Sequence, residues 1–397
     1  MVYLLRHLAG RMLLLFFCLT FALSGQSQFR QQYAMGLQML RAGSNQQAYH
    51  HFRDMLKQYP DSLQLKHALG FIDYSREQWK RANDWYKQVL RDRPNDIDAL
   101  YHSAICHREL GKFKAFVLRK KEWNIAESYF RTIQDSIGVY KDLYLQNAIL
   151  QKYRKNYTAA IEMAEKQLEY QKSAQAAALL HRYYESLVFN MNFEKARDWL
   201  RNRNGSLDSL YLAEAFRKKK EYDKAESVLA VLLQNAEADE NRVPFFIAAA
   251  KCKIEQDQID SCLFYYNRAL AFIQNDLDAE LMFENIKYIL TDSELENYNE
   301  LNHIGEKSSF FQRVWVKRNP MPASEVNYRI IEHIRRFTFA ERSYYYDHFR
   351  LPFSNPDRLN VLVFPRVFDL NEKFNDKGLV FIRHGEPDDR AFTVDGG

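Results

Sequence analysis

Apolar residues recur at helical spacing through most of the chain, with polar residues between them. Only 13 glycines and 9 prolines interrupt the 397 residues. Glycine and proline are the residues that most often end helices, so their scarcity favours long helical segments. The pattern therefore predicts a mainly α-helical protein.

Within this pattern, one set of residues returns at a fixed interval. Gly36, Ala48, Phe52 and Pro60 recur 34 residues later as Gly70, Ala82, Tyr86 and Pro94. A small residue inside a helix lets a neighbouring helix come close, an aromatic ring fills the space between units, and a proline ends the second helix. We interpret each copy as a pair of helices that packs against the next pair.

A looser signature, an aromatic residue three positions before an alanine, marks further copies. It occurs at Trp79/Ala82, Trp123/Ala126, Tyr157/Ala160, Phe193/Ala196 and Tyr222/Ala225. Asn45/Ala48 is a weaker first copy and Ile259/Cys262 a degenerate seventh copy. The spacings are 34, 44, 34, 36, 29 and 37 residues, and the longest predicts an insertion near residues 111–121, either an extended helix or a loop.

The period and the residue types resemble the tetratricopeptide repeat (TPR) family. The resemblance implies a right-handed α-solenoid of about seven helix pairs over residues 29–300, because one pair cannot bury its own apolar face. It also implies a concave groove, lined by the first helix of each pair, that binds a protein or peptide. The polar and aromatic residues expected on this groove are Lys66, Tyr74, Tyr101, His102, Tyr144, Asn147, Tyr183 and Tyr184. We interpret residues 217–220 as a solvated basic helix end.

After residue 302 the repeat signature is lost and prolines cluster. We expect a helix over residues 323–349, then a loop through Pro356 and Pro365. Residues 379–382 are four apolar residues bounded by Gly378 and Gly385, and they predict a buried strand. The expected architecture is thus a helical solenoid followed by a small α/β domain.

This C-terminal part, residues 303–397, resembles the GWxTD domain, a family of bacterial envelope proteins. Asn319, Glu372, Lys373 and Asn375 depart from the family pattern. Because family members commonly continue with a β-rich region, we expect the domain to be incomplete at its C-terminus. The resemblance rests on Trp315, Arg318, Pro320, Pro322, Asn327, Asp376, Gly378, Gly385, Glu386, Pro387 and Asp388.

The sequence Arg383-His384-Gly385-Glu386 also resembles the opening motif of histidine phosphatases. That resemblance implies a phosphohydrolase in which His384 accepts the phosphoryl group and Arg383 binds it, with Glu386 beside them. Only eleven residues follow Glu386, however. We favour a buried polar cluster of Asp376, Arg383 and Glu386 that fixes the turn after the strand. A glycan-binding role for the aromatic C-terminal part is a further alternative.

Residues 1–25 have the layout of a secretory signal peptide. Three basic residues precede the apolar run 12–23, and Ala22-Leu23-Ser24 suits cleavage. The run is shorter than the roughly 20 residues that span a bilayer. We therefore expect an exported protein, periplasmic or associated with the outer membrane, and this location allows peripheral membrane association.

The net charge and the cysteines further limit the functions and the binding sites that the sequence allows. Loss of Arg6 and Arg11 with the leader lowers the formal net charge of +5 to about +3, which argues against nucleic-acid binding by bulk charge. Cys106, Cys252 and Cys262 lie in helical patterns, where we expect small buried residues, although a Cys252–Cys262 disulfide stays open. No spacing predicts a metal or a cofactor.

These observations favour an exported scaffold or adaptor in cell-envelope assembly or secretion, rather than an enzyme. Its partner would be a protein or peptide, and its oligomeric state is not encoded in these patterns.

Overall fold

The computed structural model describes residues 27–236, 239, 242–324, 326–349 and 365–386. The chain divides into two compact units, Met1–Gln146 and Asn147–Gly397, and the boundary falls inside helix α7. Among the described residues, no helix combines the length and the apolarity that crossing a bilayer requires.

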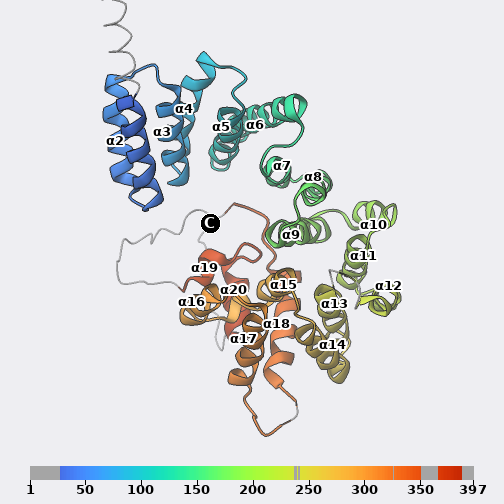
Figure 1. Cartoon of the computed structure of the whole chain (residues 1–397). Coiled ribbons are helices and arrows are strands. Elements are labelled where there is room, and N and C mark those ends of the chain that lie inside the picture. Colours follow the sequence, from blue (N-terminus) through green and yellow to red (C-terminus); the bar gives the residue numbers. More distant parts are fainter. Residues whose placement is uncertain (1–26, 237–238, 240–241, 325, 350–364, 387–397) are drawn as a thin grey trace, which may run out of the picture. The chain divides into compact units, whose positions relative to one another are not determined.

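The first unit consists of helices that pack in sequence order (Figure 1). A helix over residues 27–41 precedes the labelled helices. Those that follow are α2 (Asn45–Gln58), α3 (Leu63–Ser75), α4 (Trp79–Asp92), α5 (Ile97–Gly111), α6 (Phe116–Ile137) and the start of α7 (Leu143–Tyr153).

The second unit continues the same arrangement and adds a C-terminal group of helices. Its paired helices are α8 (Tyr157–Tyr170), α9 (Ala174–Asn190), α10 (Phe193–Arg201), α11 (Ser206–Lys218), α12 (Tyr222–Gln234), α13 (Arg242–Ile254) and α14 (Ile259–Ala271). The remainder are α15 (Asp276–Ile286), the 3₁₀ turn η2 (Lys287–Ile289), α16 (Asp292–Glu300), α17 (Ile304–Arg318), α18 (Tyr328–Ser343), α19 (Val367–Leu370) and α20 (Asp376–His384).

The repeat signature marks the second helix of each pair. Its first residue begins the helix in α2, α4, α8, α10, α12 and α14. The small residue three positions later is at most 1 % exposed in every copy: Ala48, Ala82, Ala126, Ala160, Ala196, Ala225 and Cys262. The TPR-type helix pairing predicted by the sequence is therefore confirmed, and the mainly α-helical class with it.

The repeated glycines mark close helix contacts, as predicted. An added Cβ at Gly36 would lie 2.4 Å from the ring of Phe52, and one at Gly70 would lie 2.9 Å from the ring of Tyr86. Helices α2 and α4 end at Gln58 and Asp92, two residues before the repeated prolines. Within the first two copies, the glycine and the aromatic ring thus form one packing unit.

The turn inside five of the pairs has a left-handed residue at the same place, two positions before the second helix. These residues are Gly43, Glu77, Lys155, Lys220 and Asp257, with φ between 56° and 75°. Glycine adopts this conformation without a steric penalty, and other residues adopt it at a cost. The shared turn indicates that the pairs have the same local geometry even where the sequence signature is weak.

In the second unit, the first helices of successive pairs form an inner layer. Helix α9 packs against α11, α11 against α13 and α13 against α15. Helix α9 also packs against α15, which brings the two ends of this layer together. Arg182 of α9 donates a hydrogen bond to Glu284 of α15 over 3.0 Å. The inner face of this unit is therefore closed on itself rather than open as a groove.

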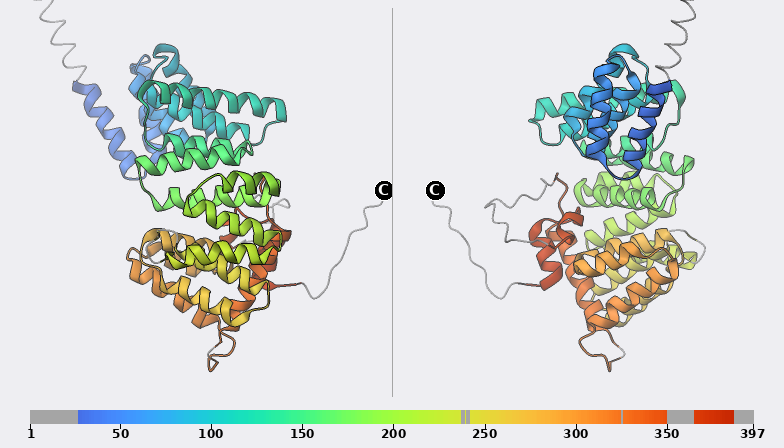
Figure 2. Two further views of the ribbon diagram at one scale, coloured as in Figure 1. Left: turned by 90° about the vertical axis from the view of Figure 1, so that its right-hand side faces the viewer. Right: turned by 60° about the vertical axis from the view of Figure 1, so that its left-hand side comes forward.

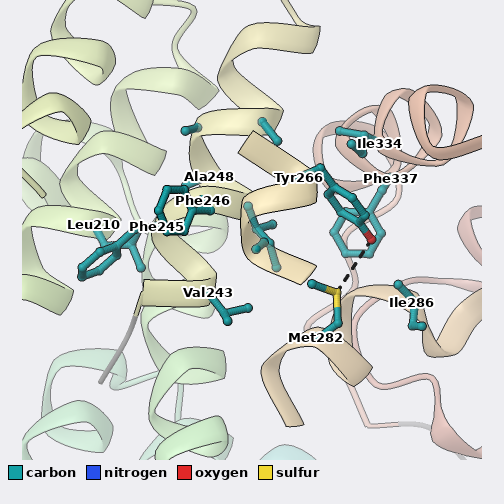
Figure 3. Close-up of a cluster of buried hydrophobic side chains, with 14 of the residues drawn as sticks. Leu210, Val243, Phe245, Phe246, Ala248, Tyr266, Met282, Ile286, Ile334 and Phe337 are labelled. Carbon is teal, nitrogen blue, oxygen red and sulfur yellow. Dashed lines mark hydrogen bonds between the residues drawn. The ribbon is translucent and has the colours of Figure 1, made fainter. Parts of the chain in front are cut away.

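The C-terminal helices belong to the same hydrophobic core as the repeats. One continuous cluster of buried residues extends from Ala148 to Ile382. Figure 3 shows Ile334 and Phe337 of α18 beside Tyr266 of α14, whose hydroxyl lies 3.8 Å from the sulfur of Met282. In both views of Figure 2, the red C-terminal helices lie beside the orange helices of this unit.

Three local predictions are corrected or refined by the structure. The predicted strand at residues 379–382 is wrong, because these residues lie in α20, where Leu379 and Ile382 are buried and Val380 is 47 % exposed. The side chain of Asn375 accepts a hydrogen bond from the Gly378 amide and begins this helix. The helix predicted over residues 323–349 is shorter, Tyr328–Ser343. The insertion near residues 111–121 is an extended helix, the 22-residue α6.

Candidate functional site: the inner faces of the two helical units

Three cations converge on the carboxylate of Glu341, which lies on α18 and is 1 % exposed. Arg217 Nη2 donates to one carboxylate oxygen over 2.9 Å, and the ammonium groups of Lys251 and Lys373 donate to the other over 2.8 Å each. Burial opposes ionisation of this carboxyl, but Lys251, Lys373 and Arg217 outweigh it and hold the Glu341 pKa well below its usual range. Glu341 is thus a buried anion that binds cations from α11, from α13 and from the non-helical segment before α20.

The surrounding carboxylates complete the charge balance. Arg217, 1 % exposed, also donates to Glu214 over 2.6 Å and to Glu255 over 2.7 Å. Lys373 also donates to Glu185 over 2.8 Å. Burial disfavours the charged form of Lys373, but Glu185 and Glu341 outweigh it and raise the Lys373 pKa. Each of these buried cations therefore has more than one carboxylate partner or shares one.

Glu341, the partner that Arg217 and Lys251 share, comes from the far end of the sequence. Arg217 and Lys251 lie on the inner helices α11 and α13, whereas Glu341 and Lys373 belong to the C-terminal part. In Figure 1 the label of α18 lies between those of α13 and α17. The C-terminal part therefore occupies the inner face of its own repeat unit.

Residues just after α18 extend this occupation along the inner face. The Tyr345 ring stacks on Phe189 at 4.8 Å, and its hydroxyl lies 3.2 Å from the Ser186 hydroxyl. Asp347 accepts a hydrogen bond from Tyr157 and pairs with Lys152 over 3.0 Å. An isolated antiparallel bridge joins Tyr345 to Phe374 and ties the two C-terminal segments to each other.

A small cavity of about 80 Å³ that is partly open to solvent remains between the inner helices and the C-terminal part. Its walls carry both signs of charge, with Arg182, Lys251 and Lys373 facing Glu185, Glu214 and Glu284. Burial raises the Glu284 pKa, but Arg182 and Lys287 outweigh it and lower the value to about 2. The cavity thus combines a mostly apolar lining with charged groups of both signs.

The first unit has a more accessible inner face. Phe71 on α3 is 48 % exposed, and its ring stacks on Tyr74 at 6.5 Å and meets the edge of His102 at 6.1 Å. Helix α3 also packs against α5, so these rings lie on the inner layer of this unit. Phe71 was not among the residues expected on the groove; its place one residue after the repeated Gly70 is the signal that could have identified it.

The groove residues expected in the first unit are mostly buried. Lys66 is 8 % exposed and pairs with Asp92 over 3.5 Å. Tyr101 and His102 are each 5 % exposed, and the Tyr101 hydroxyl donates to Asp142. Tyr144 is also buried, and Tyr74 is half-buried. Of this set, the half-buried Tyr74 and the buried His102 lie beside the exposed ring of Phe71.

The groove residues expected in the second unit hold helices together. Tyr184 is fully buried, stacks on Tyr211 at 4.9 Å and donates to Asp208 over 2.7 Å. Tyr183 is 3 % exposed. Asn147 accepts a hydrogen bond from Gln151 over 3.3 Å. The burial of these rings counts against direct contact with a partner.

Several of the C-terminal motif residues contact one another or the preceding helices. Asn327 begins α18 and donates a side-chain hydrogen bond to the Trp315 carbonyl over 2.9 Å. Arg318 holds Glu294 through both terminal nitrogens, at 2.9 and 2.6 Å. An added Cβ at Gly378 would lie 2.6 Å from the Tyr344 Cβ. Pro320 and Pro322 are exposed, and Pro387 and Asp388 lie outside the described residues.

Two of the alternative catalytic residues, Arg383 and His384, lie at the C-terminal end of α20. Arg383 donates from Nη1 to the carbonyl oxygens of Tyr288 and Leu290, at 2.9 and 3.0 Å, so its guanidinium is engaged by backbone. His384 is exposed at the end of α20. Asp376 and Glu386 are also exposed, so the expected buried cluster of Asp376, Arg383 and Glu386 is wrong. Gly385 instead adopts φ +88° against the guanidinium of Arg336.

The three described cysteines are free and buried. Burial raises the pKa of each thiol to about 12, which makes all three poor nucleophiles. The disulfide between Cys252 and Cys262 that the sequence left open is absent from the structure. Across the described ranges, no group of three or more His, Cys, Asp and Glu side chains is placed to hold a metal ion.

No protein-family model matches the chain, and no curated protein matches it. Solved structures with a similar arrangement of helices include a TPR protein from Parabacteroides merdae, with 16 % identity, 64 % of this chain and 80 % of that chain covered, and a TM-score of 0.31. PilF of Pseudomonas aeruginosa is 17 % identical, with 64 % of this chain and 96 % of that chain covered and a TM-score of 0.32. A TPR protein of Thermus thermophilus has 15 % identity, coverages of 55 % and 97 %, and a TM-score of 0.34. This likeness is limited to the arrangement of the helices.

Proposed function

We propose that this protein is a binding scaffold whose partner contacts the inner face of the first unit. The observation that carries the proposal is the contrast between the two inner faces. The second is closed by the packing of α9 on α15 and is occupied by α18 and Lys373. The first exposes Phe71 with Tyr74 beside it.

The chemistry of this aromatic site favours a protein segment with an apolar or aromatic side chain. Large rings contribute much contact area at a small loss of conformational entropy, and they dominate the energetics of protein interfaces. Beside the rings, Asp98 accepts hydrogen bonds from Tyr140 over 2.7 Å and from Lys141 over 2.6 Å. This polar rim would orient the segment around the apolar contact.

The test uses a photoreactive amino acid in place of Phe71 in cells that make the full chain. We expect one specific cross-linked protein, which is absent when the same amino acid replaces Phe264. Phe264 is a matched control because it is 58 % exposed but lies on α14, a second helix. Equal cross-linking at both positions, or none at Phe71, would contradict the proposal.

A binding measurement with the captured protein completes the test. Phe71→Ala should weaken binding by about tenfold or more, as expected for an aromatic residue at the centre of an interface. Phe264→Ala should leave the affinity unchanged. A loss of similar size in both variants would assign the partner to another surface.

The cellular setting of the scaffold is part of the same proposal. The basic residues and apolar run of residues 1–25 support export, and the proposed role is therefore in the cell envelope. These residues lie outside the described part of the chain. Fractionation of cells with intact-mass measurement of the recovered protein tests this, and recovery of the full-length chain from the cytoplasm would exclude it.

A further inference from the structure

Helix α6 has a segment that the repeat core does not need. In other copies the signature residue begins the second helix, but α6 begins at Phe116, seven residues before Trp123. The buried residues of α6 are Trp123, Ala126, Phe130 and Ile133, and none precedes Trp123. Residues 116–122 therefore extend the helix by about 10 Å at 1.5 Å per residue, without a buried side chain.

The surface of this extension is strongly apolar. Phe113, Phe116, Val117 and Leu118 are 54 %, 76 %, 75 % and 55 % exposed. Single exposed apolar residues are ordinary on protein surfaces, whereas a contiguous group marks an interaction site. The extension therefore presents apolar side chains that a packed neighbour or a membrane would cover.

Cations surround these apolar residues. The stretch from residue 112 to 121 contains Lys112, Lys114, Arg119, Lys120 and Lys121, and no acidic residue. Lys112 pairs with Glu109, and Lys114 with Glu122, so the nearest carboxylates are already engaged. Lys120 and Lys121 are exposed. The surface thus combines apolar side chains with an excess of positive charge.

We infer that residues 112–121 dock on the surface of an anionic lipid bilayer. Apolar side chains flanked by Lys and Arg are the composition of segments that lie in the membrane interface, where the apolar groups enter the acyl boundary and the cations meet lipid phosphates. A protein partner fits this composition less well, because lysine is depleted at protein–protein interfaces. The site is independent of the aromatic face proposed for partner binding.

The helix start adds to this attraction. The residue before α6, Ala115, offers no side-chain acceptor, and the first turn contains no acidic residue. The first amide groups of a helix point outward and favour an anion. Lipid phosphates would meet these groups as the first turn enters the interface.

The experiment is a flotation assay with the purified protein lacking residues 1–25. One set of vesicles contains phosphatidylcholine alone, and the other also contains about 30 mol % phosphatidylglycerol, because anionic lipids attract polybasic segments. We expect binding to the anionic vesicles and not to the neutral ones, with a loss at high salt because screening weakens surface attraction. Lys120→Glu with Lys121→Glu should reduce partitioning by at least about tenfold. Lys80→Glu with Lys166→Glu, an equal charge change at exposed positions elsewhere, should leave it unchanged.

Insertion is measured with an environment-sensitive fluorophore on Val117→Cys, since the native cysteines are buried. The probe should shift to shorter wavelength with anionic vesicles, and the same probe on Val231→Cys, an exposed position on α12, should not. Circular dichroism checks that all variants are folded. Equal flotation of both double variants, an unmoved Val117 probe, or a concentration-dependent dimer that Phe116→Ser abolishes would each overturn the inference.

Discussion

In the turn inside four of the helix pairs, a residue other than glycine holds a left-handed backbone conformation. Glu77, Lys155, Lys220 and Asp257 occupy the position that Gly43 occupies in the first pair. The conformation costs an L-residue about 1–2 kcal/mol, more than the entropy that a glycine loses on folding. The same turn is therefore built with an optimal residue once and with a strained residue four times.

This comparison predicts a stabilising substitution. Glu77→Gly or Lys155→Gly should raise the free energy of unfolding by about 0.5–1 kcal/mol, because the strain relieved exceeds the added chain entropy. Lys87→Gly, at an exposed position within α4, should lower it by about 1 kcal/mol. The midpoints of urea unfolding measure the stability of all three variants. A loss of stability at the turn positions would show that the side chains there contribute more to stability than relief of the backbone strain does.

His333 makes stability depend on pH. It is fully buried between Trp315 and Phe337, at ring distances of 5.2 and 5.8 Å. Burial, and then the nearby Arg329, lower its pKa from 6.5 to about 3. Between those values the unfolded chain binds a proton that the folded chain does not, so this contribution to stability is lost as the pH falls below 6.5.

Replacement of His333 isolates its contribution to the pH dependence of stability. For His333→Phe, the fall in unfolding free energy between pH 6 and pH 4 should be shallower than for the native chain by about 1.4 kcal/mol per pH unit. Denaturant titrations at several pH values give the two slopes. Parallel slopes would mean that His333 is protonated in the folded protein.

Residues whose partners lie nearby in the sequence were predictable, and residues with distant partners were not. The small repeat residues and the glycine–aromatic pairs follow from a 34-residue period, because both members lie in one repeat. Arg217 was interpreted as part of a solvated helix end, yet it is buried against Glu341. No local pattern relates these two residues, because 124 positions separate them.

At the scale of elements, the short apolar run at residues 379–382 shows that hydrophobic periodicity does not identify the secondary structure of a very short segment. Four apolar residues fit a strand as well as a helix. The cap at Asn375 and the burial of Leu379 and Ile382 on one face decide for the helix α20. By contrast, seven copies of one signature predicted the second helices of the repeats correctly. The recurrence of the signature identifies these helices even where a single copy would fit more than one secondary structure.

The close contact between paired helices leads to a prediction at this scale. Gly36→Ala should lower the unfolding free energy by about 1–3 kcal/mol, because its methyl group would overlap the ring of Phe52. Gly305→Ala is the matched control: it lies in the first turn of α17 with nothing within 4 Å of an added Cβ, and it should raise stability by up to about 1 kcal/mol. Thermal denaturation of both variants checks the opposite signs. A stabilising Gly36→Ala would mean that the Phe52 ring moves aside at little cost.

At the scale of the molecule, the second unit depends on one buried anion. Glu341→Gln should lower the unfolding free energy by about 3–5 kcal/mol, because it leaves Arg217, Lys251 and Lys373 without a shared counter-charge. Glu332→Gln on the same helix removes a half-exposed carboxylate that pairs with Arg329 and Arg336. Its cost should be below about 1 kcal/mol.

Limited proteolysis gives a second readout of the same change. In Glu341→Gln the C-terminal part should detach more often from the inner helices, so cleavage between residues 343 and 373 should become faster. Unchanged cleavage together with unchanged stability would show that apolar packing of α18 alone holds this part in place.

The contact of α9 with α15 also limits how this protein can change during evolution. Repeat arrays commonly gain or lose units, because each unit touches only its neighbours. Here the first and last inner helices of the second unit touch each other, so an added helix pair would have to separate Arg182 from Glu284 and open the cavity that α18 caps. Duplication of a repeat should therefore be tolerated in the first unit and rejected in the second.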